Sequence, residues 1–278
     1  MSRPATVGGA GGAAEFMLSG ALVRGEAIMI VEVKAATDQG LKRAQNEDSH
    51  GEWIPSAPEE RRRRGALVVV ADGMGGSRAG EVASRLAVET VLRWYREAPG
   101  DDLLEDLHHA VEAANRVVHR ESSTRPELSG MGTTCTAVVL RGADAYFAHV
   151  GDSRAYLIQD GRIRQLTRDH SLVAQLVREG QLTPDQAKVD PRRNVVTRSV
   201  GVGATVEIDA EHEPGLLHPG DTVLVCSDGL HGVVADEELR VAGSSADLGQ
   251  GCLDAIRLAN QRGGPDNITV VLARLASG

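Results

Sequence analysis

The chain has 278 residues, of which 41% are hydrophobic and 25% are charged, a composition typical of a globular protein that buries a sizeable core. Its 39 aspartates and glutamates outnumber its 30 lysines and arginines, and the formal net charge of −9 repels phosphate backbones. We therefore expect no nucleic-acid partner.

The cysteines and the apolar segments indicate the cellular compartment in which the protein functions. Cys135, Cys226 and Cys252 are odd in number, far apart and without a CxxC pair, which argues against a disulfide framework and a thiolate zinc site. No apolar stretch approaches the roughly 18 to 20 residues that span a bilayer, and the start of the chain does not resemble a signal peptide. We expect a cytoplasmic protein without membrane contact, with a flexible extension over residues 1–28 and a folded domain over 29–278.

The first part of the chain predicts a strand, a loop and a second strand. Alternation over Ile30–Ala36 is typical of a strand. The charged run Glu59–Arg64 is typical of a solvated loop. The apolar run Val68–Ala71 predicts a buried strand, which ends in Asp72 and a glycine turn.

Helical periodicity follows the glycine turn. Apolar residues spaced by three and four predict a helix from about Gly80 to Tyr95 and a second helix of about 18 residues from Leu103, joined by the turn Pro99-Gly100. Short runs separated by tight turns then predict antiparallel strands. These runs are Thr134–Leu140, Ala143–Val150 and Arg154–Gln159.

The last third begins with a polar, partly helical segment over residues 168–198 that interrupts the strands. The remaining pattern predicts alternating strands and helices. Strands are expected over Val206–His212, Thr222–Cys226 and Ile268–Leu272, and helices over Glu237–Val241 and Ala246–Asn260.

Aspartates recur where buried strands begin or end. Asp72 and Asp228 each follow an apolar run and precede a glycine, and Asp266 precedes the last strand. A single Asp-Gly step is usually a β-turn. Three such aspartates instead suit hard, oxygen-preferring cations such as Mg²⁺ or Mn²⁺.

Further clusters of functional residues lie at Arg43–Asp48 and Gly151–Arg154. Together with Ala71–Gly76, Gly132–Thr134, Val225–Gly229 and Asp266–Thr269, in this order, they make the chain resemble a metal-dependent serine/threonine protein phosphatase of the type 2C family from about Val33 to Arg274. Met74 stands where animal members carry histidine and many bacterial members carry methionine. The resemblance therefore favours a bacterial member.

The resemblance implies an α/β (α+β) fold, a four-layer sandwich of two central, mainly antiparallel β-sheets flanked by α-helices. Residues 168–198 would form the flap beside the active site. It also implies two Mn²⁺ or Mg²⁺ ions and a weaker third site. Asp72 would bridge the two ions, Gly73 would offer its carbonyl to one, Asp228 and Asp266 would bind the other, Glu47 and Asp48 would hold metal-bound waters, and Asp152 would join the third site with Asp228.

Local alternatives exist for several of these residues. Glu47 and Asp48 could form an exposed acidic turn, and Asp152 could be a turn aspartate. Arg43 matches the phosphate-binding arginine of the family, but it could also pair with Glu47 four residues on.

Further residues are expected to move the proton and to orient the metal ligands. Met74 cannot protonate a leaving alkoxide, so the proton comes either from a metal-bound water or from another acid. His170 is one candidate for that acid, although a loop histidine is more often structural. Asn267 is expected to orient Asp266 and its waters.

The function that the resemblance implies is hydrolysis of phosphoserine and phosphothreonine on proteins through a metal-bridging hydroxide. We expect a monomer that acts in signal transduction and opposes a bacterial serine/threonine kinase. One alternative is a catalytically silent module that binds phosphoproteins. Another is a partner-switching phosphatase that acts on a phosphorylated regulator.

Overall fold

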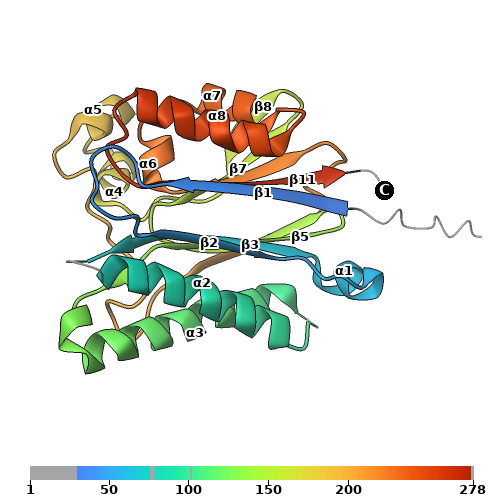
Figure 1. Cartoon of the computed structure of the whole chain (residues 1–278), viewed down its shortest axis with the longest axis horizontal. Helices are drawn as coiled ribbons and strands as arrows, with labels where there is room; N and C mark the ends of the chain where they lie inside the picture. The colour runs from blue at the N-terminus through green and yellow to red at the C-terminus, as the bar shows by residue number, and fades with distance from the viewer. Residues whose placement is uncertain (1–29, 76–78, 101, 277–278) are drawn as a thin grey trace, which may run out of the picture.

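Two antiparallel sheets lie face to face in the middle of the molecule, and helices cover the outer side of each (Figure 1). The structure is a computed structural model that describes residues 30–75, 79–100 and 102–276. This arrangement confirms the expected four-layer sandwich. The expected extension over residues 1–28 lies outside the described residues, as does Gly76 of the glycine turn.

The strands are β1 Ile30–Asp38, β2 Asp48–Trp53, β3 Ala66–Met74, β4 Gly132–Thr133, β5 Cys135–Arg141, β6 Asp144–Val150, β7 Arg154–Gln159, β8 Arg162–Gln165, β9 Asp209–Glu213, β10 Thr222–Cys226 and β11 Ile268–Ala276. The helices are α1 Pro58–Arg64, α2 Ala79–Glu97, α3 Leu103–Thr124, α4 Leu172–Arg178, α5 Pro184–Val189, α6 Asp228–His231, α7 Asp236–Gly243 and α8 Leu248–Gln261, with a 3₁₀ turn, η1, at Pro126–Leu128. No helix in these ranges is long and apolar enough to cross a membrane.

One sheet has the strand order β1-β11-β10-β7-β8 and is covered by α7 and α8. Every residue of β10 is buried because this strand has protein on both faces. Val223 and Val225 contribute to the core between the two sheets, whereas Leu224 and Cys226 pack under the helices. The all-apolar pattern of this strand thus follows from its central place.

The other sheet has the order β2-β3-β5-β6-β9, with β4 paired to β3, and is covered by α2 and α3. Val68 and Val70 of β3 face the first sheet, and Val69 packs with the helices. Ala83 and Ala87 of α2 are fully buried, and such small residues let the helix approach the sheet closely. The two long helices that periodicity predicts are confirmed.

The prediction of a solvated loop over Glu59–Arg64 is wrong. These residues form α1, and Arg64 at its end is 1% exposed. Its guanidinium donates to the carbonyls of Tyr95 and Ala98 and lies 4.5 Å from the centre of the Tyr95 ring. The last carbonyls of a helix lack partners within the helix, so the end of α2 accepts a buried cation.

The strand ends that carry the expected site meet at one end of the sandwich. Asp48 at the start of β2 pairs in register with Asp72 near the end of β3. Cys226 at the end of β10 pairs with Val270 near the start of β11. Helices α4, α5 and α6 gather at the same end of the molecule (Figure 1).

Candidate active site

Five aspartates from separate parts of the chain approach one another at this end. Asp72 lies on β3, Asp48 begins β2 opposite it, and Asp228 begins α6 directly after β10. Asp266 precedes β11, and Asp152 lies in the turn from β6 to β7, which crosses from one sheet to the other. The structure therefore brings together the aspartates that the sequence marks as metal ligands.

Backbone and hydroxyl contacts fix Asp72. Its N–H donates to Thr134 Oγ1 over 2.8 Å, and its carbonyl accepts from Thr133 Oγ1 over 2.9 Å. Thr134 Oγ1 also lies 2.7 Å from Ser153 Oγ. The turn that carries Asp152 is thus linked to the strand that carries Asp72.

Two carboxylate oxygens are buried without a hydrogen-bond partner among the described residues, Asp48 Oδ1 and Asp228 Oδ1. The second oxygen of Asp48, Oδ2, accepts from Ser227 Oγ over 2.7 Å. A buried carboxylate oxygen that lacks a donor is unfavourable unless a cation or another donor serves it. These oxygens therefore fit divalent cations, which prefer oxygen ligands.

The raised pKa values of the clustered aspartates also favour a site for divalent cations. Burial, together with repulsion from the other carboxylates, raises the pKa of Asp48 to about 7, of Asp152 to about 8 and of Asp228 to about 6. The same causes raise the pKa of Asp72 well above its ordinary value. Bound divalent cations would offset this repulsion and keep the carboxylates ionised.

The glycines beside the aspartates are required because backbone approaches them closely. A Cβ at Gly73 would lie 2.1 Å from the carbonyl oxygen of Gly80, and a Cβ at Gly229 would lie 2.0 Å from that of Asn267. The N–H of Gly73 donates to the carbonyl of Glu47 over 3.1 Å. The acidic pair is thereby held beside the glycine turn, while the ligand roles of Gly73 and Glu47 stay predictions.

Arg43 pairs with Asp266, and not with Glu47. Its Nη2 donates to Asp266 Oδ2 over 2.6 Å. The Arg43 side chain is 49% exposed, so most of its donors remain open to a ligand. The arginine expected to bind phosphate therefore lies beside an aspartate that is predicted to bind metal.

Asn267 holds the loop that carries Arg43. Its Oδ1 accepts from the N–H of Glu47 over 2.8 Å, and its Nδ2 donates to the carbonyls of Gln39 and Gln45 over 2.9 and 2.8 Å. Only its backbone N–H reaches Asp266 Oδ1, over 2.9 Å. The side chain that we expected to orient Asp266 instead fixes the β1–β2 loop.

A cleft of about 990 Å³ extends from the aspartates to the segment over residues 168–198. That segment contains α4 and α5, as its partly helical pattern predicts. At its base, the N–H of His170 donates to the carbonyl of Gly151 over 2.7 Å, and His170 Nδ1 accepts from the N–H of Gly151 over 3.1 Å. His170 is buried and does not line the cleft, so its place is that of a structural residue rather than a proton donor.

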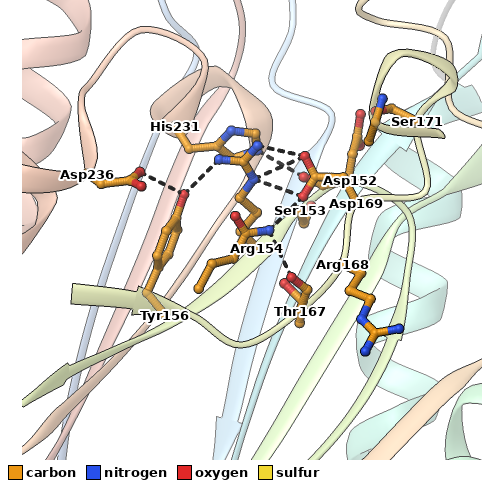
Figure 2. Close-up of polar contacts among 12 residues, drawn as sticks. Asp152, Ser153, Arg154, Tyr156, Thr167, Arg168, Asp169, Ser171, His231 and Asp236 are labelled. Carbon is orange, nitrogen blue, oxygen red and sulfur yellow. Dashed lines mark hydrogen bonds and ion pairs between the residues drawn. The ribbon is translucent and has the colours of Figure 1, made fainter. Parts of the chain in front are cut away.

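Figure 2 shows a polar network on the wall of the cleft that the sequence did not predict. Arg154 donates from Nε and Nη2 to both carboxylate oxygens of Asp169, over 2.7 to 3.1 Å, and from Nη1 to the hydroxyl of Tyr156 over 2.9 Å. That hydroxyl donates to Asp236 Oδ1 over 3.2 Å. The network joins the strand after Asp152 to the base of the segment over residues 168–198.

His231 is a second residue that sequence reasoning missed. Its Nε2 donates to the carbonyl of Asp152 over 2.9 Å, and burial, together with nearby Arg154, lowers its pKa to about 3. The neutral ring ties α6, which begins with Asp228, to the turn that carries Asp152. The only local signal is its spacing, three residues after Asp228.

Known proteins that are similar to this chain are protein phosphatases of a single family. The family model described as protein phosphatase 2C matches residues 43–257. The serine/threonine protein phosphatase PstP of Mycobacterium tuberculosis is 39% identical over 249 residues, which cover 88% of this chain, and the chain spans 45% of the length of that protein. The serine/threonine phosphatase stp of Listeria monocytogenes is 38% identical, with 85% of this chain and 92% of that protein covered.

A solved structure of a serine/threonine phosphatase also has a similar fold. It is described as the catalytic domain of the serine threonine protein phosphatase PstP in complex with two manganese ions. Its TM-score is 0.76 at 36% sequence identity, with 90% of this chain and 100% of that chain covered.

Proposed function

The chain belongs to the protein phosphatase 2C family, and we propose that it hydrolyses phosphoserine and phosphothreonine in proteins with the help of divalent metal ions. One observation carries this proposal. Asp48, Asp72, Asp152, Asp228 and Asp266 meet beside Arg43 at a cleft, and two of their buried oxygens have no donor among the described residues. A phosphate-binding arginine beside a cluster of carboxylates is the arrangement that metal-assisted phosphate hydrolysis needs.

The residues of the chain have distinct tasks in this proposal. Asp72, Asp228 and Asp266 would hold two Mn²⁺ or Mg²⁺ ions, Gly73 would add its carbonyl, Glu47 and Asp48 would hold waters, and Asp152 would serve a third site. When bound, such ions supply charge neutralisation at the phosphate and a water of lowered pKa. Arg43 would bind two phosphate oxygens through its planar fork and so orient the phosphorus.

The leaving alkoxide must take up a proton, and no side chain of the described site is placed to donate it. Met74 has no acidic proton, and His170 lies outside the cleft. His231 is neutral and its Nε2 proton is engaged by the carbonyl of Asp152. We propose that the proton comes from solvent in the cleft.

The cellular setting is also part of the proposal. Phosphorylated proteins as substrates imply an opposing serine/threonine kinase and a role in signal transduction. Cys135, Cys226 and Cys252 are buried free thiols, which supports a reducing compartment such as the cytoplasm. The exposed large apolar residues in the described ranges lie on different elements, which supports a monomer.

The proposal is tested by phosphate release from a phosphothreonine peptide, with p-nitrophenyl phosphate and a phosphotyrosine peptide alongside. We expect turnover of the phosphothreonine peptide in Mn²⁺, complete loss in excess chelator and recovery when Mn²⁺ is restored. Turnover that survives the chelator would contradict the metal requirement. Absence of turnover with Mn²⁺ would favour the silent phosphoprotein-binding module.

A further inference from the structure

The flap side of the cleft carries three arginines, Arg168, Arg178 and Arg193, which we call the flap arginines. All three are exposed, and none forms an ion pair with a described residue. The other cations that line the cleft are already paired. Arg43 pairs with Asp266, Arg154 with Asp169, Lys188 with Asp185 and Arg262 with Glu238.

The backbone that carries the flap arginines is held in place while their guanidinium groups stay available. The carbonyl of Arg168 lies 3.1 Å from Nε2 of the buried His149, and its side chain points away from the Arg154–Asp169 pair in Figure 2. Arg178 ends α4, and among the described residues it donates only from Nη1, to the carbonyl of Asp169 over 3.2 Å. Its remaining donors are free to bind a ligand.

Arg193 contrasts with its neighbour Arg192. Arg192 donates from Nε and Nη2 to the two oxygens of Asp190, both over 2.9 Å, and does not line the cleft. The backbone N–H of Arg193 donates to the carbonyl of Asp190 over 3.1 Å, and its side chain lines the cleft without a carboxylate partner. The same turn therefore places one arginine in an internal pair and the next at the cleft.

The formal net charge of the chain is −9, so three cations along one cleft without an ion pair to a described residue oppose the overall charge locally. Guanidinium groups match carboxylates and phosphates, and three of them at one rim attract anions locally against the charge of the whole chain. The cleft, at about 990 Å³, has room for residues beside the phosphorylated one. The positive charge of the three arginines and the volume of the cleft together suit a substrate with acidic groups near its phosphorylated residue.

We propose that the flap arginines form a subsite for anionic side chains, carboxylates or a second phosphate, that flank the phosphorylated residue of the substrate protein. This inference rests on the proposed function and specifies its substrates. The acidic residues of a substrate would contact the flap while its phosphate reaches Arg43 and the aspartates.

The test compares kcat/KM for matched phosphothreonine peptides in Mn²⁺. The flanking positions carry glutamate, glutamine, lysine or a second phosphothreonine. For the natural sequence at low ionic strength, we expect an anionic flank to raise kcat/KM about fivefold to tenfold over glutamine, as several exposed ion pairs together would give. Added salt should reduce this ratio, because exposed pairs are screened.

Two variants and one control decide the assignment. Arg168→Gln, Arg178→Gln and Arg193→Gln combined should lower the ratio to about one, and Arg193→Glu should favour the lysine peptide. Arg192→Gln is the matched control and should keep the ratio of the natural sequence. Of the two anionic peptides, the one that gives the larger ratio identifies whether carboxylate or phosphate is preferred.

The outcomes separate this inference from the proposed function. Metal-dependent turnover of the glutamine peptide with no preference for an anionic flank would overturn the subsite alone. A preference that survives in the triple variant would also overturn it. Absence of metal-dependent turnover of every peptide would overturn the proposed function, and the subsite with it.

Discussion

Arg43 donates to Asp266 over 2.6 Å, although 223 positions separate them in the chain. The contact joins the loop after β1 to the segment before β11, so it orients the guanidinium before substrate binds. The two side chains are 49% and 22% exposed, and an exposed pair of this kind adds little stability. Its importance therefore lies in positioning the guanidinium that we propose binds the phosphate.

Arg43→Lys keeps the charge but removes the planar fork that would take two phosphate oxygens in the proposed function. We expect kcat/KM for a phosphothreonine peptide to fall about 10- to 100-fold, as for loss of a charged hydrogen bond. The measurement is steady-state kinetics in saturating Mn²⁺, with Lys42→Arg, at an exposed neighbouring position, as the control. An unchanged kcat/KM for Arg43→Lys would show that Arg43 does not bind the phosphate as proposed.

Asn267→Ala should loosen the β1–β2 loop, because the side chain forms hydrogen bonds with the backbone of Gln39, Gln45 and Glu47. We expect a loss of about 2 to 3 kcal/mol in the free energy of unfolding. The amide of Glu47 should also exchange faster with deuterium. Gln261→Ala, at the exposed end of α8, is the control. Unchanged protection of the Glu47 amide would contradict the role given to Asn267.

The ion pair of Arg154 and Asp169 predicts non-additive stability. The side chains are 23% and 12% exposed, so either Arg154→Met or Asp169→Asn leaves a largely buried charge without its partner. Each single variant should lose about 2 to 3 kcal/mol in the free energy of unfolding, less than for a fully buried pair. The double variant should lose less than the sum of the two. Urea denaturation measures all three, and additive losses would show that the pair is not coupled.

His149 predicts sensitivity of the fold to acid. The ring is fully buried, its Nδ1 lies 2.9 Å from Thr136 Oγ1, and burial together with nearby His170 lowers its pKa from 6.5 to about 4. The unfolded chain therefore binds more protons than the folded chain between about pH 4 and pH 6.5. Stability from this residue is present above pH 6.5 and is lost as pH falls to about 4, by up to about 3 kcal/mol.

The comparison of His149→Gln with the natural sequence isolates that contribution. The free energy of unfolding of the variant should change less between pH 7 and pH 4.5. His109→Gln, on the exposed side of α3, should keep the natural pH dependence. Equal slopes for His149→Gln and the natural sequence would show that His149 does not titrate as described.

The sequence predicts those helices and strands whose residue pattern is set by burial alone. Thr222–Cys226 is apolar because the strand is buried on both faces, and it forms β10 with the predicted bounds. The periodic helices are likewise found as α2 and α3. By contrast, β2 has the mixed sequence Asp-Ser-His-Gly-Glu-Trp and forms an edge strand by pairing with β3, a partner that local pattern does not reveal.

The site was predictable to a similar extent. Asp72 and Asp228 are visible because each is followed by glycine after an apolar run. Arg43 has a carboxylate four residues away, which suggested Glu47, but the fold supplies Asp266 from the far end of the chain. Asp169, which pairs with Arg154, and His231 contact the site only through tertiary structure, so no spacing identified their partners.

The most direct test of the metal-assisted phosphatase combines two readouts on one variant. Mn²⁺ binding, followed by electron paramagnetic resonance, and phosphate release from a phosphothreonine peptide are measured for the natural sequence, Asp228→Asn and the exposed turn control Asp160→Asn. We predict tight Mn²⁺ binding and turnover in the natural sequence and the control. Asp228→Asn should lose both, with turnover reduced by about a thousandfold or more. Tight Mn²⁺ binding and full turnover in Asp228→Asn would contradict the assignment of the aspartates.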